Sequence, residues 1–385
     1  MSDTVRGWVD LVHAHWPPAH ASSWDNVGLQ VGDPAWPVAR VLVCLDVTPA
    51  VIGEAATVAH TLVLAHHPLL FRPLETLTPS TASGRTALLA ASHRVAVLAV
   101  HTNLDVAGDG VGTSDPVAKV LDLRDRTALT SHLTESANVK VVTFVPVGYT
   151  EAVLDAMAGA GAGTIGDYDR CSFRVAGRGT FTPREGATPF SGQVGLPNAD
   201  AEERLEMVVP RRRLAGVLTA LRAAHPYEEV AIDTHPLLDQ AEVGFGVVGD
   251  LPQPTVLRSV AEALRSRLPS PHLRLAGDPG RFVQRVAVVG GAGDSLITAA
   301  HAAGADVYVT GDLRHHVTLD ALTQGMAVID AGHHATEVAA LAPWQARLAD
   351  LAARAGLEAP LVASGVSTDP WVVDTETSVE DRTHA

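Results

Sequence analysis

The stretch Met326-Ala327-Val328-Ile329-Asp330-Ala331-Gly332-His333-His334-Ala335-Thr336-Glu337 joins an apolar run to two histidines and a glutamate. The apolar run indicates a buried strand. His333 and Glu337 stand four residues apart at an expected helix start, so their side chains would share one helix face. Imidazole and carboxylate groups together bind divalent transition metals. This stretch therefore predicts a strand that ends at a metal site.

Two earlier stretches repeat the arrangement. The apolar residues 61–65 lead directly into His66 and His67, and residues 95–100 lead to Asp105. Continuous apolar runs separated by Ala-rich helical stretches predict an α/β fold, with a three-layer α/β/α main domain and a mostly parallel sheet. Ligands of such sheets collect at the carboxyl ends of the strands. We therefore expect the three stretches to converge.

The ligand types favour two metals rather than one. Side chains of adjacent residues on an extended backbone diverge, so His66 and His67 are better suited to two ions. Two close metals need a bridging carboxylate, and Asp105 and Glu337 are the candidates. The alternative stays open, because in a chain with 18 histidines a His-His pair can also be an ordinary surface or core pair.

Six motifs in the same order resemble the NIF-three-like dinuclear-metal proteins, whose members are often labelled homologues of a type 2 GTP cyclohydrolase. They are Ser23-Trp24-Asp25-Asn26-Val27-Gly28-Leu29-Gln30-Val31-Gly32, Leu45-Asp46-Val47-Thr48, His66-His67-Pro68-Leu69, His101-Thr102-Asn103-Leu104-Asp105, Thr310-Gly311-Asp312 and Gly332-His333-His334-Ala335-Thr336-Glu337. The resemblance implies two divalent ions per chain (Zn, Fe, Mn, Co or Ni) and a homohexamer. The implied ligands are His66, His67, Asp105, His333 and Glu337.

The middle of the chain changes organisation. Residues 138–240 alternate strands and helices as two β-α-β units, which predicts a ferredoxin-like α+β domain inserted into the main domain. The segment resembles the insert of some bacterial family members that is related to the nitrogen-regulatory P-two and copper-tolerance proteins, most specifically at His225-Pro226-Tyr227-Glu228-Glu229-Val230. We therefore expect main-domain halves at 1–137 and 241–373, and a disordered polar tail at 374–385.

Further candidates surround the predicted site. His315 and His316 follow another strand end and are candidate catalytic groups that move protons to or from a substrate. The turn 290–293 is either a tight structural turn or a phosphate cradle, but it lacks the full dinucleotide and P-loop fingerprints, so no nucleotide cofactor is predicted. Cys44, in an apolar run, is expected to be a structural thiol, and Asp46 beside it could support a ligand.

Composition limits the remaining choices. The formal net charge of -15 argues against a nucleic-acid partner. No apolar run is long enough to span a membrane, and the first thirty residues lack a signal-peptide pattern, so we expect a cytoplasmic protein. Two function classes remain: a hydrolase in which metals activate water towards a small nucleotide-like or phosphorylated substrate, and a regulatory or metal-handling assembly that senses a small ligand through the insert.

Overall fold

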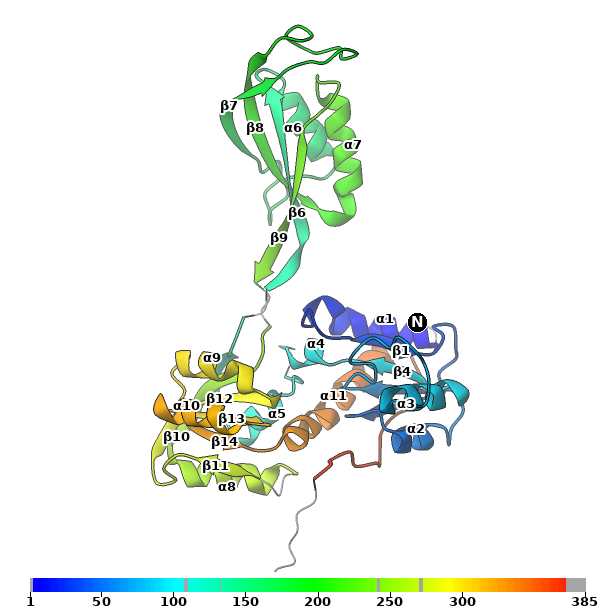
Figure 1. Cartoon of the computed structure of the whole chain (residues 1–385), viewed down its shortest axis with the longest axis vertical. Helices are drawn as coiled ribbons and strands as arrows, with labels where there is room; N and C mark the ends of the chain where they lie inside the picture. The colour runs from blue at the N-terminus through cyan, green and yellow to red at the C-terminus, as the bar shows by residue number, and fades with distance from the viewer. Residues whose placement is uncertain (1–2, 107–109, 132, 241–242, 270–272, 372–385) are drawn as a thin grey trace, which may run out of the picture. The chain divides into compact units, whose positions relative to one another are not determined.

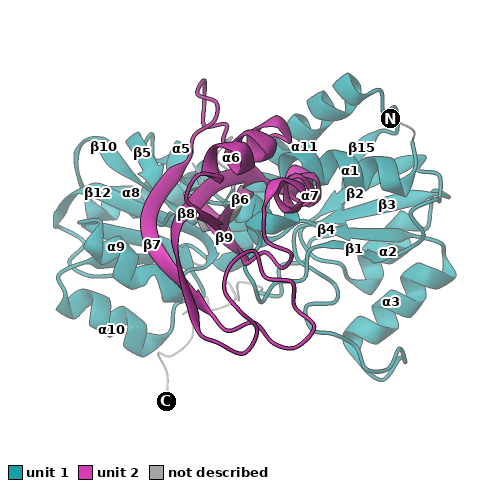
Figure 2. Cartoon of the chain, turned by 90° about the horizontal axis from the view of Figure 1, so that it is seen from above, with its two compact units in different colours: residues 1–132, 241–385 teal, residues 133–240 magenta. Residues whose placement is uncertain are grey.

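The computed structural model describes residues 3–106, 110–131, 133–240, 243–269 and 273–371 (Figure 1). The expected disordered tail, 374–385, lies outside the described residues. The chain divides into two compact units (Figure 2). Unit 1 combines residues 1–132 with 241–385, and unit 2 is Leu133–Gln240. Unit 2 contains the segment 138–240 and begins slightly earlier.

Unit 1 contains a first sheet with the strand order β1-β4-β3-β2-β15. These strands are β1 (Gly28–Val31), β4 (Ala96–Ala99), β3 (Thr61–Ala65), β2 (Arg40–Cys44) and β15 (Leu361–Ala363). The four strands from β4 to β15 are parallel, and β1 pairs with β4 in the antiparallel direction. The apolar runs predicted at 61–65 and 95–100 are the two central strands β3 and β4.

Alternation along these strands gives the first sheet two apolar faces. Leu62 and Leu64 pack on one face with α1 (Val5–His15) and α11 (His333–Ala355). Val63 and Ala65 pack on the other face with α2 (Pro49–Ala55) and α3 (Ala82–Ser92). Because successive strand residues point to opposite faces, a continuous apolar run is what a sheet covered on both sides requires.

The second sheet of unit 1 has the order β11-β14-β13-β12-β10-β5. Its strands are β11 (Arg274–Ala276), β14 (Ala327–Asp330), β13 (Val307–Gly311), β12 (Phe282–Ala292), β10 (Val247–Val256) and β5 (Arg124–Ala128). The helices around it are α5 (Asp115–Val120), α8 (Leu257–Arg267), α9 (Ile297–Ala302) and α10 (His315–Thr323). Helices α5 and α8 pack on one face and α9 and α10 on the other.

The α/β class is confirmed, but the three-layer arrangement occurs twice in unit 1 rather than once around a single sheet. The central strands β12, β13 and β14 are parallel, whereas β10, β5 and β11 are antiparallel to their neighbours. Antiparallel strands flank the parallel part of the second sheet on both sides and that of the first sheet on one side. Helix α11 joins the two sheets, because it contacts β12 and β13 of one and β2 and β15 of the other.

Unit 2 has the element order β-α-β-β-α-β. Its strands are β6 (Leu133–Pro146), β7 (Phe173–Phe181), β8 (Asn198–Pro210) and β9 (Ile232–Gln240), and its helices are α6 (Thr150–Gly159) and α7 (Leu214–Ala224). The sheet order is β7-β8-β6-β9 with antiparallel pairs throughout. Both helices pack on one face of this sheet, where Val141, Leu205 and Met207 are buried with Val153 and Leu221.

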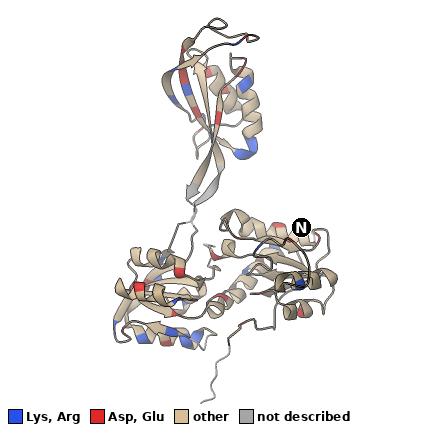
Figure 3. Ribbon diagram, in the orientation of Figure 1, with Lys and Arg blue, Asp and Glu red and all other residues tan. Residues whose placement is uncertain are grey.

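Short elements complete the chain, namely α4 (Thr102–Asp105) and the 3-10 turns η1 (Pro18–His20), η2 (Arg211–Arg213) and η3 (Asp294–Leu296). Asp and Glu are interspersed with Lys and Arg on both units (Figure 3). Within the described residues, no helix has the length and apolar character needed to cross a membrane.

Candidate metal centre

Three strand ends of unit 1 bring the predicted ligands together. His66 and His67 follow β3, Asp105 ends α4 just after β4, and His333 and Glu337 lie in the first turns of α11 after β14. The Glu337 carboxylate is the common neighbour: Oε2 lies 3.0 Å from His67 Nε2 and 3.1 Å from His333 Nε2, and Oε1 lies 3.7 Å from His66 Nε2. Asp105 Oδ1 lies 3.4 Å from His66 Nε2.

Two overlapping groups among the described residues could hold a metal ion. One consists of His66, His67 and His101, and the other of His67, His333 and Glu337. Within each group the ligand atoms lie within 4.8 Å of one another. The spacing of four residues between His333 and Glu337 does place both side chains on one helix face, as predicted.

The imidazoles of the cluster share a hydrogen-bonding pattern on their Nδ1 atoms. His66 Nδ1 lies 3.0 Å from the Val100 carbonyl oxygen. The other three Nδ1 atoms face carboxylates: His67 with Asp46 at 2.8 Å, His101 with Asp25 at 2.9 Å and His333 with Asp312 at 2.7 Å. An oxygen at Nδ1 accepts its proton and leaves the Nε2 lone pair free. Metal-binding histidines in proteins are oriented by such partners.

Two buried atoms of the cluster lack an aligned hydrogen-bond partner, namely His66 Nε2 and Glu337 Oε2. The imidazole nitrogens near Glu337 approach it closely but are not aligned to donate. Buried polar atoms without partners are rare in folded proteins and often mark a missing ion or water. The residues present therefore fit divalent cations, which would give each of these atoms a partner.

The electrostatics of the cluster favour positive charge. Burial would lower the pKa of His67, but Asp46 and Glu337 raise it to about 10. Burial likewise opposes protonation of His333, yet Glu337 and Asp312 raise its pKa to about 9. Burial would raise the pKa of Glu337, whereas the neighbouring imidazoles hold it well below its ordinary value. The carboxylates thus stabilise a cation in the cluster, either as protons or as a metal.

Glycines shape the cradle of Glu337. Gly291, at the end of β12, has φ +69°, and a Cβ atom there would lie 2.1 Å from Glu337 Oε1. A Cβ atom on Gly311 would lie 2.5 Å from the backbone nitrogen of His333. Within the turn 290–293, Gly290 would collide with Thr113 and Gly293 with Thr310 and Tyr308 if either carried a Cβ atom, so only Gly291 packs against the candidate ligands. The close packing of all three glycines is what the first of the two interpretations above, a tight structural turn, requires.

The structure adds His101 to the predicted cluster. Its ring centroid lies 5.1 Å from that of His66 and 5.4 Å from that of His67. The position of His101 directly after the strand β4 was a usable signal, since the other candidates share it. His66 and His67 do not diverge as expected, because the chain bends at both residues and holds their rings 5.0 Å apart.

His315 and His316, the predicted catalytic groups, lie apart from the cluster. Both are exposed in the first turn of α10 and face each other, with ring centroids 5.2 Å apart. Neither lines the two cavities that border the cluster. The backbone of Asp312 has φ 54°, and this left-handed turn separates the strand end from α10, so Asp312 rather than a histidine of α10 contacts the cluster.

Cys44 is buried in β2, and burial raises the pKa of its thiol, as expected for a structural cysteine. Asp46, two residues later, contacts the cluster through His67. Asp25, the partner of His101, has its pKa lowered to about 2, because hydrogen bonds from His101 and Thr102 outweigh the effect of burial. The carboxylates that anchor the imidazoles thus include residues whose role the sequence left open.

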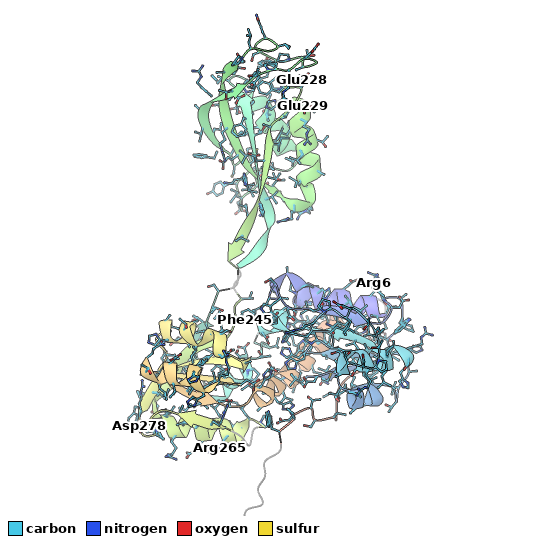
Figure 4. The ribbon with its side chains drawn as sticks, in the orientation of Figure 1. Arg6, Glu228, Glu229, Phe245, Arg265 and Asp278 are labelled. Carbon is cyan, nitrogen blue, oxygen red and sulfur yellow. The ribbon has the colours of Figure 1, made fainter. Side chains whose placement is uncertain are left out.

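Two cavities border the cluster. One, of about 560 Å³, is lined by His101, Asp105 and Glu337 together with Trp24 and Phe71. Phe245, labelled in Figure 4, also lines it. The second, of about 600 Å³, is lined by residues that include His67, His333, Arg274 and Trp371. Trp24 and Phe71 are 60% and 46% exposed, so they offer open aromatic surface beside the candidate ligands.

Comparisons with known proteins agree with this geometry. Residues 4–370 match the family described as Duf34/NIF3 (NGG1p interacting factor 3). A protein of Mycobacterium tuberculosis named GTP cyclohydrolase 1 type 2 homolog is 40% identical over 382 residues, covering 98% of this chain and 99% of the relative. A Bacillus subtilis protein of the same name is 40% identical over 341 residues, covering 88% and 91%.

Solved structures give the same assignment. A Bacillus cereus protein related to NIF3 is similar with a TM-score of 0.67 and 36% identity, covering 96% of this chain and 99% of that one. The Staphylococcus aureus protein SA1388 is similar with a TM-score of 0.76 and 27% identity, covering 97% and 99%. With the match extending over nearly the whole sequence, this chain belongs to the Duf34/NIF3 family.

Proposed function

We propose that unit 1 binds two divalent metal ions and hydrolyses a small nucleotide-like or phosphorylated substrate. The observation that carries the proposal is the set of imidazoles whose Nδ1 atoms are held by oxygen acceptors while their Nε2 atoms face Glu337 or Asp105. A dinuclear centre would supply Lewis acidity and activate water near neutral pH. The names of the relatives, homologues of a GTP cyclohydrolase, agree with a nucleotide-like substrate.

Five of the six proposed ligands lie in the two groups described above, and Asp105 lies outside both, beside His66. His66, His67, Asp105, His333 and Glu337 would hold the ions, with His101 as a sixth donor. Glu337 approaches imidazoles of both groups, so its carboxylate is the proposed bridge, as the sequence analysis suggested. Asp105 accepts a hydrogen bond from Thr113 Oγ1 at 2.7 Å, which fixes its orientation towards His66.

The chain also offers a surface for an aromatic substrate. Trp24 and Phe71 have ring centroids 5.8 Å apart, and Trp24 lies 6.1 Å from the His101 ring. Flat rings bind well against such exposed aromatic side chains. Ser22 and Thr102, which line the same cavity, bring hydroxyl groups near the cluster. A base that stacks on Trp24 would place its substituents towards the candidate ligands.

The test combines metal content with turnover. Wild-type protein should bind close to two equivalents of metal by elemental analysis and convert at least one compound of a panel of GTP, other nucleotides and phosphoesters. Glu337→Gln should lose most of the metal and the activity. Glu358→Gln, a control at an exposed glutamate that follows α11, should keep both. Full metal content in Glu337→Gln would contradict the site, and a fully metallated wild type without turnover would contradict the hydrolase.

The second function class has one observation in its favour. Unit 2 contains a cavity of about 760 Å³, which a sensing module would need. A fully metallated protein that converts nothing but binds a metabolite through unit 2 would replace the hydrolase with a regulatory or metal-handling role. In either case we propose a cytoplasmic homohexamer without a nucleic-acid partner, and the assembly is measured by light scattering.

A further inference from the structure

The cavity of unit 2 lies on the face of its sheet opposite the two helices. Leu205 and Met207 of β8 pack beneath α6 and α7, and the alternating residues Glu202 and Arg204 therefore point to the other face. Glu202 and Arg204 line the cavity together with Phe144 of β6. The floor of the cavity is thus a sheet surface that carries one acidic, one basic and one aromatic side chain.

Two loops cover this floor. Residues 182–197 connect β7 to β8, and residues 225–231 connect α7 to β9. The loops contact each other, because the Thr188 backbone N–H donates to Glu228 Oε1 at 2.8 Å and the Phe190 and Tyr227 rings lie 5.6 Å apart. Figure 4 labels Glu228 at the end of unit 2 where both loops lie. The cavity therefore has a defined cover built from two linked segments.

The floor holds a buried carboxylate that lacks a cationic partner. Glu202 is 7% exposed, and the Tyr227 hydroxyl donates to its Oε1 at 2.8 Å. Within the described part of the chain, no Lys, Arg or His forms an ion pair with Glu202. Arg204, two residues along the same strand face, donates to Glu206 at 2.8 Å instead. Burying a charge is costly unless a partner neutralises it, so a ligand is a natural source of that partner.

A glycine on the neighbouring strand accommodates the Glu202 carboxylate. A Cβ atom on Gly179 would lie 2.1 Å from Glu202 Oε2, so the missing side chain of Gly179 leaves room for Glu202 to keep its position. The rings of Phe144, Phe190 and Tyr227 line the same cavity. The exposed side chains at the rim carry both signs of charge: Arg178 and Arg184 are basic, and Glu228 and Glu229 are acidic. The buried charge of Glu202 therefore dominates the selection of a ligand.

We propose that unit 2 binds a small planar molecule with an amidine or guanidine edge, whose two parallel N–H groups donate to Glu202. A carboxylate pairs best with such a two-pronged donor, and the aromatic rings favour a flat ligand. A metal ion is a poorer occupant, because Glu202 belongs to neither group of described residues that could hold one. The edge can come from a free cation, such as an amidinium, or from a guanine-type ring.

The experiment measures binding to the full chain by isothermal titration calorimetry. Benzamidine represents the free cation and guanosine the ring, with benzamide and adenosine as matched compounds that lack the two-donor edge. We expect benzamidine or guanosine to bind and its matched compound to bind more weakly. Binding of benzamidine alone identifies a cation site, and binding of guanosine alone identifies a guanine-type site. No binding of either up to millimolar concentration overturns the proposal.

Two substitutions of neighbouring acids test the role of Glu202. Glu202→Gln should weaken binding about 10- to 100-fold, because a charged acceptor is lost. Glu203→Gln, the next residue of the same strand, points to the other face and should bind as the wild type. Unchanged affinity in Glu202→Gln overturns the proposal.

Thermal stability separates binding from a structural role. In the Glu202→Gln variant, the new amide oxygen can still accept from the Tyr227 hydroxyl, and the uncompensated charge is gone. The ligand-free melting temperature of Glu202→Gln should therefore equal or exceed that of the wild type. A lower melting temperature would mean that Glu202 is a structural anchor for Tyr227, which also overturns the proposal.

Gly179→Ala, which crowds the Glu202 carboxylate, should weaken binding independently.

Discussion

At the scale of single residues, the candidate metal centre depends on which nitrogen of each histidine is available. Asp25, Asp46 and Asp312 face the Nδ1 atoms of His101, His67 and His333. Removing such a carboxylate partner lowers metal affinity about 10- to 100-fold in known sites, although it is not itself a ligand. We therefore expect Asp25, Asp46 and Asp312 to orient the imidazoles of the candidate metal centre rather than to bind the metal themselves.

The buried His225 of unit 2 has a lowered pKa, in contrast to the raised pKa values of His67 and His333. His225 Nε2 donates to the Phe144 carbonyl oxygen at 3.0 Å, and Nδ1 accepts from the Tyr227 backbone N–H at 3.1 Å. Acceptance by Nδ1 requires the neutral ring, because protonation would place a hydrogen on that nitrogen. Burial lowers the pKa of His225 below its ordinary value of 6.5.

This pKa shift predicts a pH dependence of stability. The unfolded chain takes up a proton on His225 more readily than the folded chain, so the stabilisation is present above pH 6.5 and is lost as pH falls through the folded pKa. The wild type should therefore lose more melting temperature between pH 7.5 and 5.5 than His225→Gln, as measured by circular dichroism. Equal losses in the two proteins would show that His225 does not titrate on unfolding.

At the scale of elements, the first turns of α11 are fixed by the ends of neighbouring strands. The Gly291 backbone N–H donates to Thr336 Oγ1 at 2.9 Å, and Asp330 Oδ1 accepts from the Gly332 N–H at 3.1 Å. Gly332 itself has φ 88°, which favours glycine directly before His333. The strands β12 and β14 thus determine where His333 and Glu337 point.

Gly291→Ala should disrupt this connection. The new Cβ would collide with Glu337 and would occupy a left-handed conformation, so we expect a loss of about 1–3 kcal/mol of stability and of most of the bound metal. Gly53→Ala is the control, because Gly53 is exposed within α2 and its Cβ would meet no atom within 4 Å. That change should stabilise the protein by about 0.5–1 kcal/mol. Chemical denaturation and elemental analysis measure both effects; retained metal in Gly291→Ala would contradict the cradle.

At the scale of the whole molecule, metal binding should stabilise unit 1 without changing the stability of unit 2. All six tryptophans lie outside 133–240, so tryptophan fluorescence reports the unfolding of unit 1 alone. Metal bound at 1,000 times its dissociation constant stabilises the folded state by about 4 kcal/mol. A chelator should lower the unfolding temperature of unit 1 measured by fluorescence. The unfolding temperature of unit 2, measured as the remaining transition in circular dichroism, should stay unchanged. Glu337→Gln should show no chelator effect on either signal, and a shift of both transitions in the wild type would contradict the separation.

The chain ends of unit 2 suggest that it can be removed. Leu133 pairs with Gln240 across the antiparallel ladder, so the two ends lie about 5 Å apart. In unit 1, the Thr130 N–H donates to the Phe245 carbonyl oxygen at 3.1 Å, which brings the flanking strands together. Deleting 132–243 and joining Ser131 to Gly244 through a short Gly/Ser linker should give a soluble protein that keeps its metal. Insoluble or metal-free protein would show that unit 1 needs the insert.

The sequence by itself predicted the elements and five residues that the structure brings together in the candidate metal centre. An apolar run such as 61–65 encodes a strand covered on both faces, and the spacing of His333 and Glu337 encodes a shared helix face, because both are local properties of the chain. The motif order also determined the family.

Only the tertiary structure decided how these elements combine. The apolar runs carry no information about which strands pair, so the division of unit 1 into two sheets was not visible in them. His101 joins the cluster, and His315 and His316 stay outside it, because the bend after β4 and the left-handed turn at Asp312 set the directions of the chain. The buried Glu202 likewise depends on two distant loops that close over one sheet face. Long-range approach of side chains is a property of the packed molecule, whereas periodicity and ligand spacing are properties of the sequence.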